Sequence, residues 1–307
     1  ILFAISPILY NVGIILGALL LYPLFGLVGI GMGVVLGALL HLLIHIPFVK
    51  SVGALPGLVV PSPKLIWSIV ADSIPRSLAL GLGAVTTLLL TSLASRTGEG
   101  AVSVFTFASN LEAVPLALIG ASYATAAFPV LSDEAHANRH EKFASTLLAA
   151  SRHLVFWSSI ALVLTIVLRA HIVRTLLGTG AFDWNATRLT SALLAVLVVG
   201  LASQGFILLA SRAFYAMRRS WTPFVIQIVG LITSVGGAYG ALWLSRENEL
   251  FLHFFETLLR VDGVAGSEVL FIALGATIGQ LCMGVVTVVT LQLVAKGVAP
   301  KLLQPLF

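Results

Sequence analysis

Charged side chains are scarce in this sequence. Only 9% of its 307 residues are Asp, Glu, Lys or Arg, whereas soluble domains carry roughly 25%. Hydrophobic residues make up 59% of the chain, and its mean hydropathy is +1.07. So few charges cannot cover a water-facing surface, which argues against a soluble enzyme with a large core and predicts a chain that lies in lipid.

Motifs of catalysis and cofactor binding are also missing. The sequence has no GxxxxGK[ST] phosphate loop, no GxSxG nucleophile turn and no arginine-rich voltage-sensor repeat. Its single cysteine, Cys282, cannot form an internal disulfide. His41 and His45 are four residues apart and would share a helix face, which fits an interfacial polar patch better than a pair of metal ligands. We therefore expect no enzyme, no cofactor and no metal site.

Apolar runs of membrane length are what the sequence does contain. A helix needs about 20 apolar residues to cross the ~30 Å hydrocarbon layer of a bilayer. The sequence therefore predicts an all-α polytopic transmembrane bundle of about eight helices. Because it begins at Ile1 and is apolar from the start, we expect a fragment that lacks an unknown N-terminal part. The expected spans are residues 3–22, 27–48, 77–95, 103–131, 145–168, 189–211, 222–244 and 269–295.

Two connections have the pattern of amphipathic helices on the membrane surface. In residues 61–75, Ser62 is a candidate N-cap and apolar residues follow at amphipathic spacing. In residues 132–153, Ser132 is a candidate cap with two acids in the first turn, which suits the helix dipole. Either segment could instead extend the adjoining span.

The distribution of Lys and Arg predicts the orientation. Positive charge accumulates on the cytoplasmic side of a membrane protein. The odd-numbered connections hold six of the 17 Lys and Arg residues, and the even-numbered connections with the C-terminal tail hold eleven. The first span should therefore run outward, and a net charge of +5 fits contact with anionic membrane lipids rather than nucleic acid. The eleven are Lys50, Lys64, Arg76, Arg139, Lys142, Arg152, Arg212, Arg218, Arg219, Lys296 and Lys301.

The fourth span carries polar groups at its start and weak points along its length. Twenty residues without a formal charge separate Glu112 from Asp133. Pro115 removes a backbone hydrogen bond and clashes with the carbonyl of Leu111, which loosens the turn that holds Asn110 and Glu112. Gly120 and its small neighbours allow a second helix to approach closely. We interpret Pro115 and Gly120 as a hinge in a cavity-lining helix of a transporter; an inert kinked helix is the alternative.

A few polar side chains are expected at or near membrane depth. Such groups line a substrate or ion pathway, or they bond neighbouring helices together. The second role fits Gln204 and Gln227, and a cavity role fits the groups near Pro115. The set comprises Asn11, Arg76, Ser109, Asn110, Glu112, Gln204 and Gln227.

Four ordered motifs resemble the MviN/MurJ family, the lipid II flippases of the multidrug/oligosaccharidyl-lipid/polysaccharide exporter superfamily. "ASNLEAVPLALIGASYATAAFPVLS" (108–132) resembles the signature segment of the family. The other three resemble its fifth helix, its GAFD-containing outer loop with the tenth helix, and the start of its eleventh helix. They are "SPILYNVGIILGALLL" (6–21), "LLGTGAFDWNATRLTSALL" (176–194) and "RAFYAMRRSWTP" (212–223). The resemblance covers residues 1–244 and weakens after that.

The resemblance implies two six-helix lobes that face each other across a central cavity. Residues 1–60 would be the last two helices of the N-terminal lobe, and residues 61–307 the C-terminal lobe with its surface helices. The implied activity is alternating-access flipping of undecaprenyl-pyrophosphate-linked peptidoglycan precursor across the cytoplasmic (inner) membrane. The implied partners are the lipid-linked precursor, membrane lipids and cell-wall synthesis proteins.

This chain departs from the family pattern at one point in the signature segment. Ser109-Asn110 stands where many members carry an Asp-Arg pair, so one cationic phosphate contact is lost. We expect Arg76, Asn110, Glu112 and Asn11 to bind the substrate, with Arg76 compensating for the lost charge; the alternative for Arg76 is a snorkelling arginine, or one ion-paired with Glu112. Export of another lipid-linked saccharide or of a drug, and a non-transporting scaffold for cell-wall assembly, are the alternative functions.

Overall fold

The computed structural model describes residues 2–51, 53, 62–180 and 182–298, and no β-strand occurs among them. Eight helical segments in this part of the chain are long and apolar enough to cross a membrane, as predicted. Many of their large apolar side chains are exposed, as expected for helices that face lipid. The chain divides into two compact units, residues 1–66 and 67–307.

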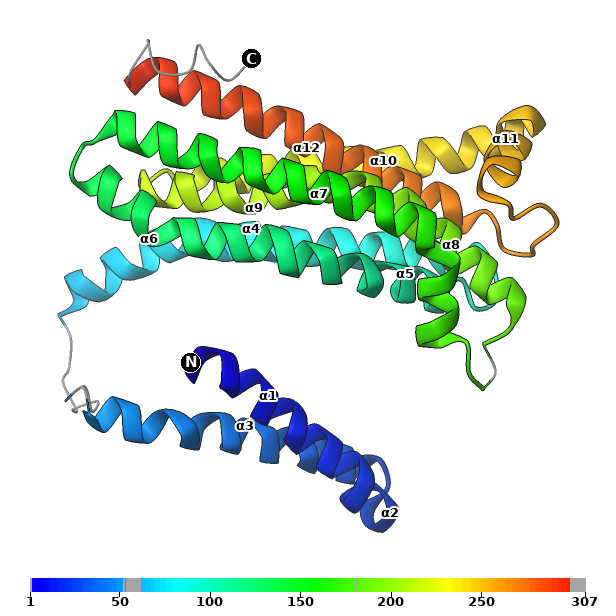
Figure 1. Ribbon diagram of the computed structural model, residues 1–307, viewed down its shortest axis with the longest axis horizontal. Coiled ribbons are helices and arrows are strands. Elements are labelled where there is room, and N and C mark those ends of the chain that lie inside the picture. Colours follow the sequence, from blue (N-terminus) through cyan, green and yellow to red (C-terminus); the bar gives the residue numbers. More distant parts are fainter. Residues whose placement is uncertain (1, 52, 54–61, 181, 299–307) are drawn as a thin grey trace. The chain divides into compact units, whose positions relative to one another are not determined.

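The first unit is a helical hairpin (Figure 1). Its first span is broken by a short π-helix, and Gly26 makes the turn between the spans with a φ of 59°. The two spans touch through glycines: Gly13 lies against Gly37, and Gly17 against Gly33. The elements are α1 (Leu2–Leu16), η1 (Gly17–Leu21), α2 (Tyr22–Phe25) and α3 (Leu27–Ser51).

The described part of the second unit holds six spans, two of which are interrupted, and the first of them begins at Pro63, just before the boundary between the units (Figure 1). A π-helix divides the second span of this unit and a short 3₁₀ helix divides the fourth. Its elements are α4 (Pro63–Ala94), α5 (Ala101–Pro115), η2 (Leu116–Ala121), α6 (Ser122–His136), α7 (His140–Leu177), α8 (Trp184–Leu197), η3 (Val198–Gly200), α9 (Leu201–Ala216), α10 (Trp221–Glu247), α11 (Glu249–Leu259) and α12 (Val269–Val298).

Local sequence explains several helix ends of this unit. Asp183, in the GAFD-containing motif, caps α8 by accepting a hydrogen bond from the backbone N–H of Ala186 at 2.7 Å. Asn248 caps α11 in the same way through Phe251. Helix α11 is a short amphipathic helix that the sequence patterns did not predict.

The two expected surface helices are not separate elements. Ser62 accepts a hydrogen bond from the N–H of Leu65 at 3.4 Å, but the helix that follows continues without a break to Ala94. The prediction for residues 132–153 was wrong, because Ser132 lies inside α6 and caps nothing. The chain turns at residues 137–139, where Asn138 has a φ of 54°, and α7 begins at His140. Both segments therefore belong to spans, which is the alternative reading of the sequence.

Two apolar clusters form the core of the second unit. One lies around α5, α8 and α12, with Phe271 fully buried. The other lies around α6, α7 and α9, with Phe214 fully buried. The break in the α5–η2–α6 span comes between the segments that enter these two clusters, so the span is packed firmly on both sides of its weak point.

Candidate functional site

The broken span places one acid inside the protein. Glu112 lies one turn before the end of α5, and 6% of its surface is exposed. The side-chain amide of Gln204, on α9, donates a hydrogen bond to its Oε1. The prediction that Gln204 bonds neighbouring helices together is confirmed by this contact. A buried polar pair of this kind ties α5 to α9 where lipid could not satisfy either group.

The predicted hinge residues adjoin this pair. Pro115 is the last residue of α5, and the π-helix η2 starts directly after it. A π-turn is one of the recognised causes of a break in a helix, and it is frequent at functional sites. Gly120 is buried in η2, and a Cβ atom there would lie 2.9 Å from the Cα of Gly205 on α9. The close helix approach predicted for Gly120 is therefore confirmed.

Arg76 lies on α4 and contacts the last turn of α9 and the residue just before α10. Its guanidinium stacks over the ring of Tyr215, 4.8 Å from the ring centre, and its Nε donates a 3.4 Å hydrogen bond to the Oγ of Ser220. The residue is exposed. The structure thus gives Arg76 and Glu112 different partners, and the alternative of an ion pair between them is not what it shows.

Asn110 and Glu112 lie on different faces of α5. Asn110 is exposed, whereas Glu112 is buried against α9. Residues two apart on an α-helix are separated by about 200° around its axis, which explains the difference. Asn11 is exposed on the first unit, and its side-chain amide donates a 3.0 Å hydrogen bond to the carbonyl of Pro7 on its own helix. Glu112 therefore has the contacts of a positioning group, and Arg76, Asn110 and Asn11 are the accessible ones.

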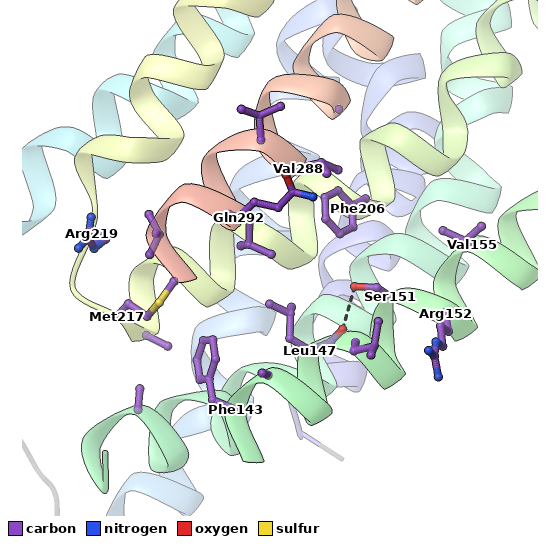
Figure 2. Close-up of a pocket in the computed structure, with 18 of the residues that line it drawn as sticks. Phe143, Leu147, Ser151, Arg152, Val155, Phe206, Met217, Arg219, Val288 and Gln292 are labelled. Carbon is purple, nitrogen blue, oxygen red and sulfur yellow. Dashed lines mark hydrogen bonds between the residues drawn. The ribbon is translucent and has the colours of Figure 1, made fainter. Parts of the chain in front are cut away.

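A large cavity at one end of the second unit was missed by the sequence analysis. It has a volume of about 1310 Å³ and lies between α7, α9 and α12, at the turns that follow α6 and α9 (Figure 2). Its walls are largely apolar, with Phe143 and Leu147 from α7, Phe206 from α9 and Val288 from α12. The only sequence signal for it was the cluster of arginines that the orientation argument counted as loop charges.

The fold and these sites define a multi-pass helical membrane protein. One of its spans is interrupted by a π-helix and is tied to a neighbouring helix by a buried polar hydrogen bond. Comparison with protein families matches residues 1–252 to lipid II flippase MurJ. The match covers well over half of the chain, and the chain belongs to this family. It confirms the resemblance seen in the four motifs.

The sequence relatives agree with this assignment. The chain is 28% identical over 240 residues to the lipid II flippase MurJ of Burkholderia cenocepacia, a match that covers 75% of this chain and 46% of that protein. It is 29% identical over 227 residues to a probable lipid II flippase MurJ of Thermotoga maritima, covering 74% and 45%. The chain thus spans about half the length of the curated relatives it matches.

Solved structures show the same fold. A lipid II flippase MurJ in an inward closed conformation matches with a TM-score of 0.67 and 19% identity, over 94% of this chain and 56% of that one. An outward-facing multidrug resistance MATE family transporter of the MOP superfamily matches with a TM-score of 0.71 and 21% identity, over 94% and 61%.

Proposed function

We propose that the protein to which this chain belongs flips a lipid-linked peptidoglycan precursor across the cytoplasmic membrane. Residues 1–60 would belong to the N-terminal lobe and residues 61–307 to the C-terminal lobe. The observation that carries the proposal is the α5–η2–α6 span, which is broken beside a buried polar pair in a chain of the lipid II flippase family. Transporters use discontinuous helices of this kind to change the access of a central site.

Two exposed polar groups of the second unit, Arg76 on α4 and Asn110 on α5, suit a cargo that carries a pyrophosphate. Arg76 is held by Tyr215 and Ser220, so its guanidinium is positioned while its residue stays exposed. Arginine binds phosphate groups with two parallel hydrogen bonds. Asn110 can donate a hydrogen bond but brings no charge. We assign substrate contact to Arg76 and Asn110, with Asn11 as a separate candidate on the first unit, and a positioning role to Glu112.

The test measures precursor translocation in cells that are depleted of their own flippase and express the natural protein. Arg76→Ala should lower translocation without lowering the amount of folded protein. Asn110→Arg should keep or raise it, because the site gains a bidentate phosphate donor. Arg96→Ala, at the exposed turn between α4 and α5, is the matched control and should have no effect.

Two outcomes would contradict the proposal. Normal translocation by Arg76→Ala and Glu112→Ala, singly and together, would remove the assigned site. Failure of the correctly inserted natural protein to restore translocation would favour another cargo or a scaffold for cell-wall synthesis proteins.

The orientation can be tested independently with an impermeant thiol reagent in intact cells. In a Cys282→Ala background, Asp183→Cys should be labelled, whereas Lys142→Cys and Arg218→Cys should be protected on the cytoplasmic side. The expectation follows from the eleven-to-six distribution of Lys and Arg. Labelling at position 142 but not at 183 would reverse the topology.

A further inference from the structure

The cavity between α7, α9 and α12 combines apolar walls with bordering arginines, as a lipid site would, and it is separate from the Glu112 site. Helix α9 presents different side chains to the two places. Gln204 bonds Glu112 and Gly205 lies against Gly120, whereas Ser203 and Phe206 line the cavity. An occupant of the cavity would therefore not displace the Glu112–Gln204 bond.

Three exposed arginines surround the apolar walls of this cavity. Arg152 projects from α7, while Arg218 and Arg219 lie in the turn between α9 and α10 (Figure 2 labels Arg152 and Arg219). Among the described residues that line it, none is Asp or Glu. Among the described residues, the acids within ion-pairing distance of a basic group are Glu268, with Arg246, and Glu256, with His253. The charge of the three arginines is therefore left for another anion.

The backbone at Arg218 has the left-handed conformation of a helix C-terminal turn. The turn after α9 is a Schellman motif, in which the N–H of Arg219 bonds the carbonyl of Phe214 at 2.8 Å and the N–H of Arg218 bonds that of Tyr215 at 3.0 Å. The motif places Arg218 at a φ of 59°. Glycine is the usual residue there, because a side chain in the left-handed region is strained. Arginine at this position keeps a guanidinium beside the cavity at the expense of local stability.

We propose that this cavity binds an anionic phospholipid of the cytoplasmic leaflet. Arg218 and Arg219, which are adjacent in the turn after α9, would hold the phosphodiester by paired, charge-assisted hydrogen bonds, and the acyl chains would lie along Phe143, Leu147, Phe206 and Val288. The arginines and the apolar walls together favour an anionic lipid over other ligands. Free phosphate would leave the apolar walls in contact with water, and an uncharged lipid would leave the arginines without a partner. The volume of about 1310 Å³ also exceeds the roughly 300–1,000 Å³ typical of pockets for drug-sized ligands.

The test uses the purified natural protein in detergent, with phosphatidylglycerol as the probe and zwitterionic phosphatidylcholine as its control. Binding is measured by the rise in the thermal midpoint with lipid concentration. Phosphatidylglycerol should raise the midpoint at concentrations where phosphatidylcholine and inorganic phosphate do not. Arg218→Gly should weaken the apparent affinity on the order of tenfold, through the loss of a charge-assisted contact.

The chain offers a matched control for this substitution. Arg260, at the end of α11, occupies the same position of a second Schellman motif with a φ of 61°, and it does not line the cavity. Arg260→Gly removes the same charge and relieves the same backbone strain, so it should leave lipid affinity unchanged. Both glycine variants should unfold at the same or a higher temperature without lipid, which separates lost binding from lost folding.

A second variant tests the apolar part of the site. Val288→Trp should fill part of the apolar space beside α12 and weaken phosphatidylglycerol binding while leaving all three arginines in place. The proposal is overturned if phosphatidylcholine or inorganic phosphate gives the same thermal shift, or if Arg218→Gly and Arg260→Gly bind phosphatidylglycerol equally well. Absence of any shift in the natural protein would also overturn it, since another part of that protein would then fill the cavity. None of these outcomes depends on precursor translocation.

Discussion

The two π-helices among the described residues make the same kind of contact in different surroundings. Each contributes one glycine to a glycine–glycine approach: Gly17 of η1 lies against Gly33 of α3, and Gly120 of η2 lies against Gly205 of α9. Around η1 the contact continues through further glycines, with Gly13 against Gly37. Around η2 the glycine pair is joined by a buried acid–amide bond and preceded by a proline.

This difference suggests which helix contact stays fixed during a conformational change and which one rearranges. Close backbone packing is the main attraction available between helices in lipid, and a run of glycines maximises it. In the first unit a polar link between the two spans, from the Oγ of Ser6 to the Nε2 of His45 at 3.3 Å, lies near the helix ends rather than beside the glycines. In the second unit the polar bond lies beside the break. We therefore expect the first contact to be a fixed seam and the second to depend on a bond that a conformational change could exchange.

The largest effect is expected from filling the glycine seam. A Cβ atom at Gly33 would lie 2.6 Å from the Cα of Gly17, so Gly33→Leu must push α1 and α3 apart. We expect a loss of about 3 kcal/mol or more, at the upper end of overpacking effects. The measurement is the thermal midpoint of the purified protein, together with cysteine cross-linking between α1 and α3.

Gly31→Leu is the control for this substitution. Gly31 lies on the same helix, and a Cβ atom there would meet nothing within 4 Å in the described structure. Its replacement should change stability little. Equal losses for the two variants would show that α3 is sensitive to any added side chain and that the seam has no special role.

The polar bond at η2 should give a smaller but specific effect. Glu112→Ala leaves the amide of Gln204 without its partner, at a cost of about 1–3 kcal/mol for a buried group. Gln204→Leu alone leaves the buried side chain of Glu112 without its hydrogen-bond donor. The double variant should be more stable than the sum of the two losses predicts, with a coupling of about 0.6–1.7 kcal/mol, as measured for polar pairs in membranes.

Ser109→Ala is the control for the double-mutant cycle of Glu112→Ala and Gln204→Leu. The hydroxyl of Ser109 donates to the carbonyl of Phe105 on its own helix at 2.9 Å and makes no link to α9. Its loss should be small and additive with either variant. Strict additivity of Glu112→Ala with Gln204→Leu would mean that the bond contributes nothing to the contact.

Much of this comparison could be predicted from the sequence, because it rests on local patterns. The eight spans follow from apolar length, and the close approach at Gly120 follows from residue type. A weak point near Pro115 was also expected, but in the turn that holds Asn110 and Glu112, whereas α5 stays α-helical through Pro115 and the π-helix follows it. Helical spacing alone would also have separated Asn110 from Glu112, which we expected to act together. The pairing of Glu112 with Gln204, 92 residues apart, needed the tertiary structure.

The arginine-lined cavity could not be predicted for a related reason. Arg152 and Arg218 line the same cavity only because α7, α12 and the turn after α9 enclose it, and the sequence shows them as ordinary loop charges. The positive φ of Arg218 is likewise set by a Schellman motif whose usual residue is glycine, so residue type pointed away from it.

The smallest effect is expected at Gly205, and it sharpens the contrast between the two glycine contacts. A Cβ atom there would lie 3.1 Å from a methyl group of Leu154 and 3.3 Å from the Cα of Gly120. A movement of a few tenths of an ångström by the Leu154 side chain would admit it. Alanine also favours a helix over glycine by roughly 1 kcal/mol, so Gly205→Ala should change stability by less than about 1 kcal/mol in either direction.

Gly33→Ala gains the same helix propensity but meets backbone atoms, and should remain clearly destabilising. Thermal midpoints of the two variants, measured under the same conditions, show which glycine contact tolerates an added methyl group. If Gly205→Ala were as costly as Gly33→Ala, the contact at η2 would be as tightly fixed as the first seam, and the case for η2 as the movable break would fail.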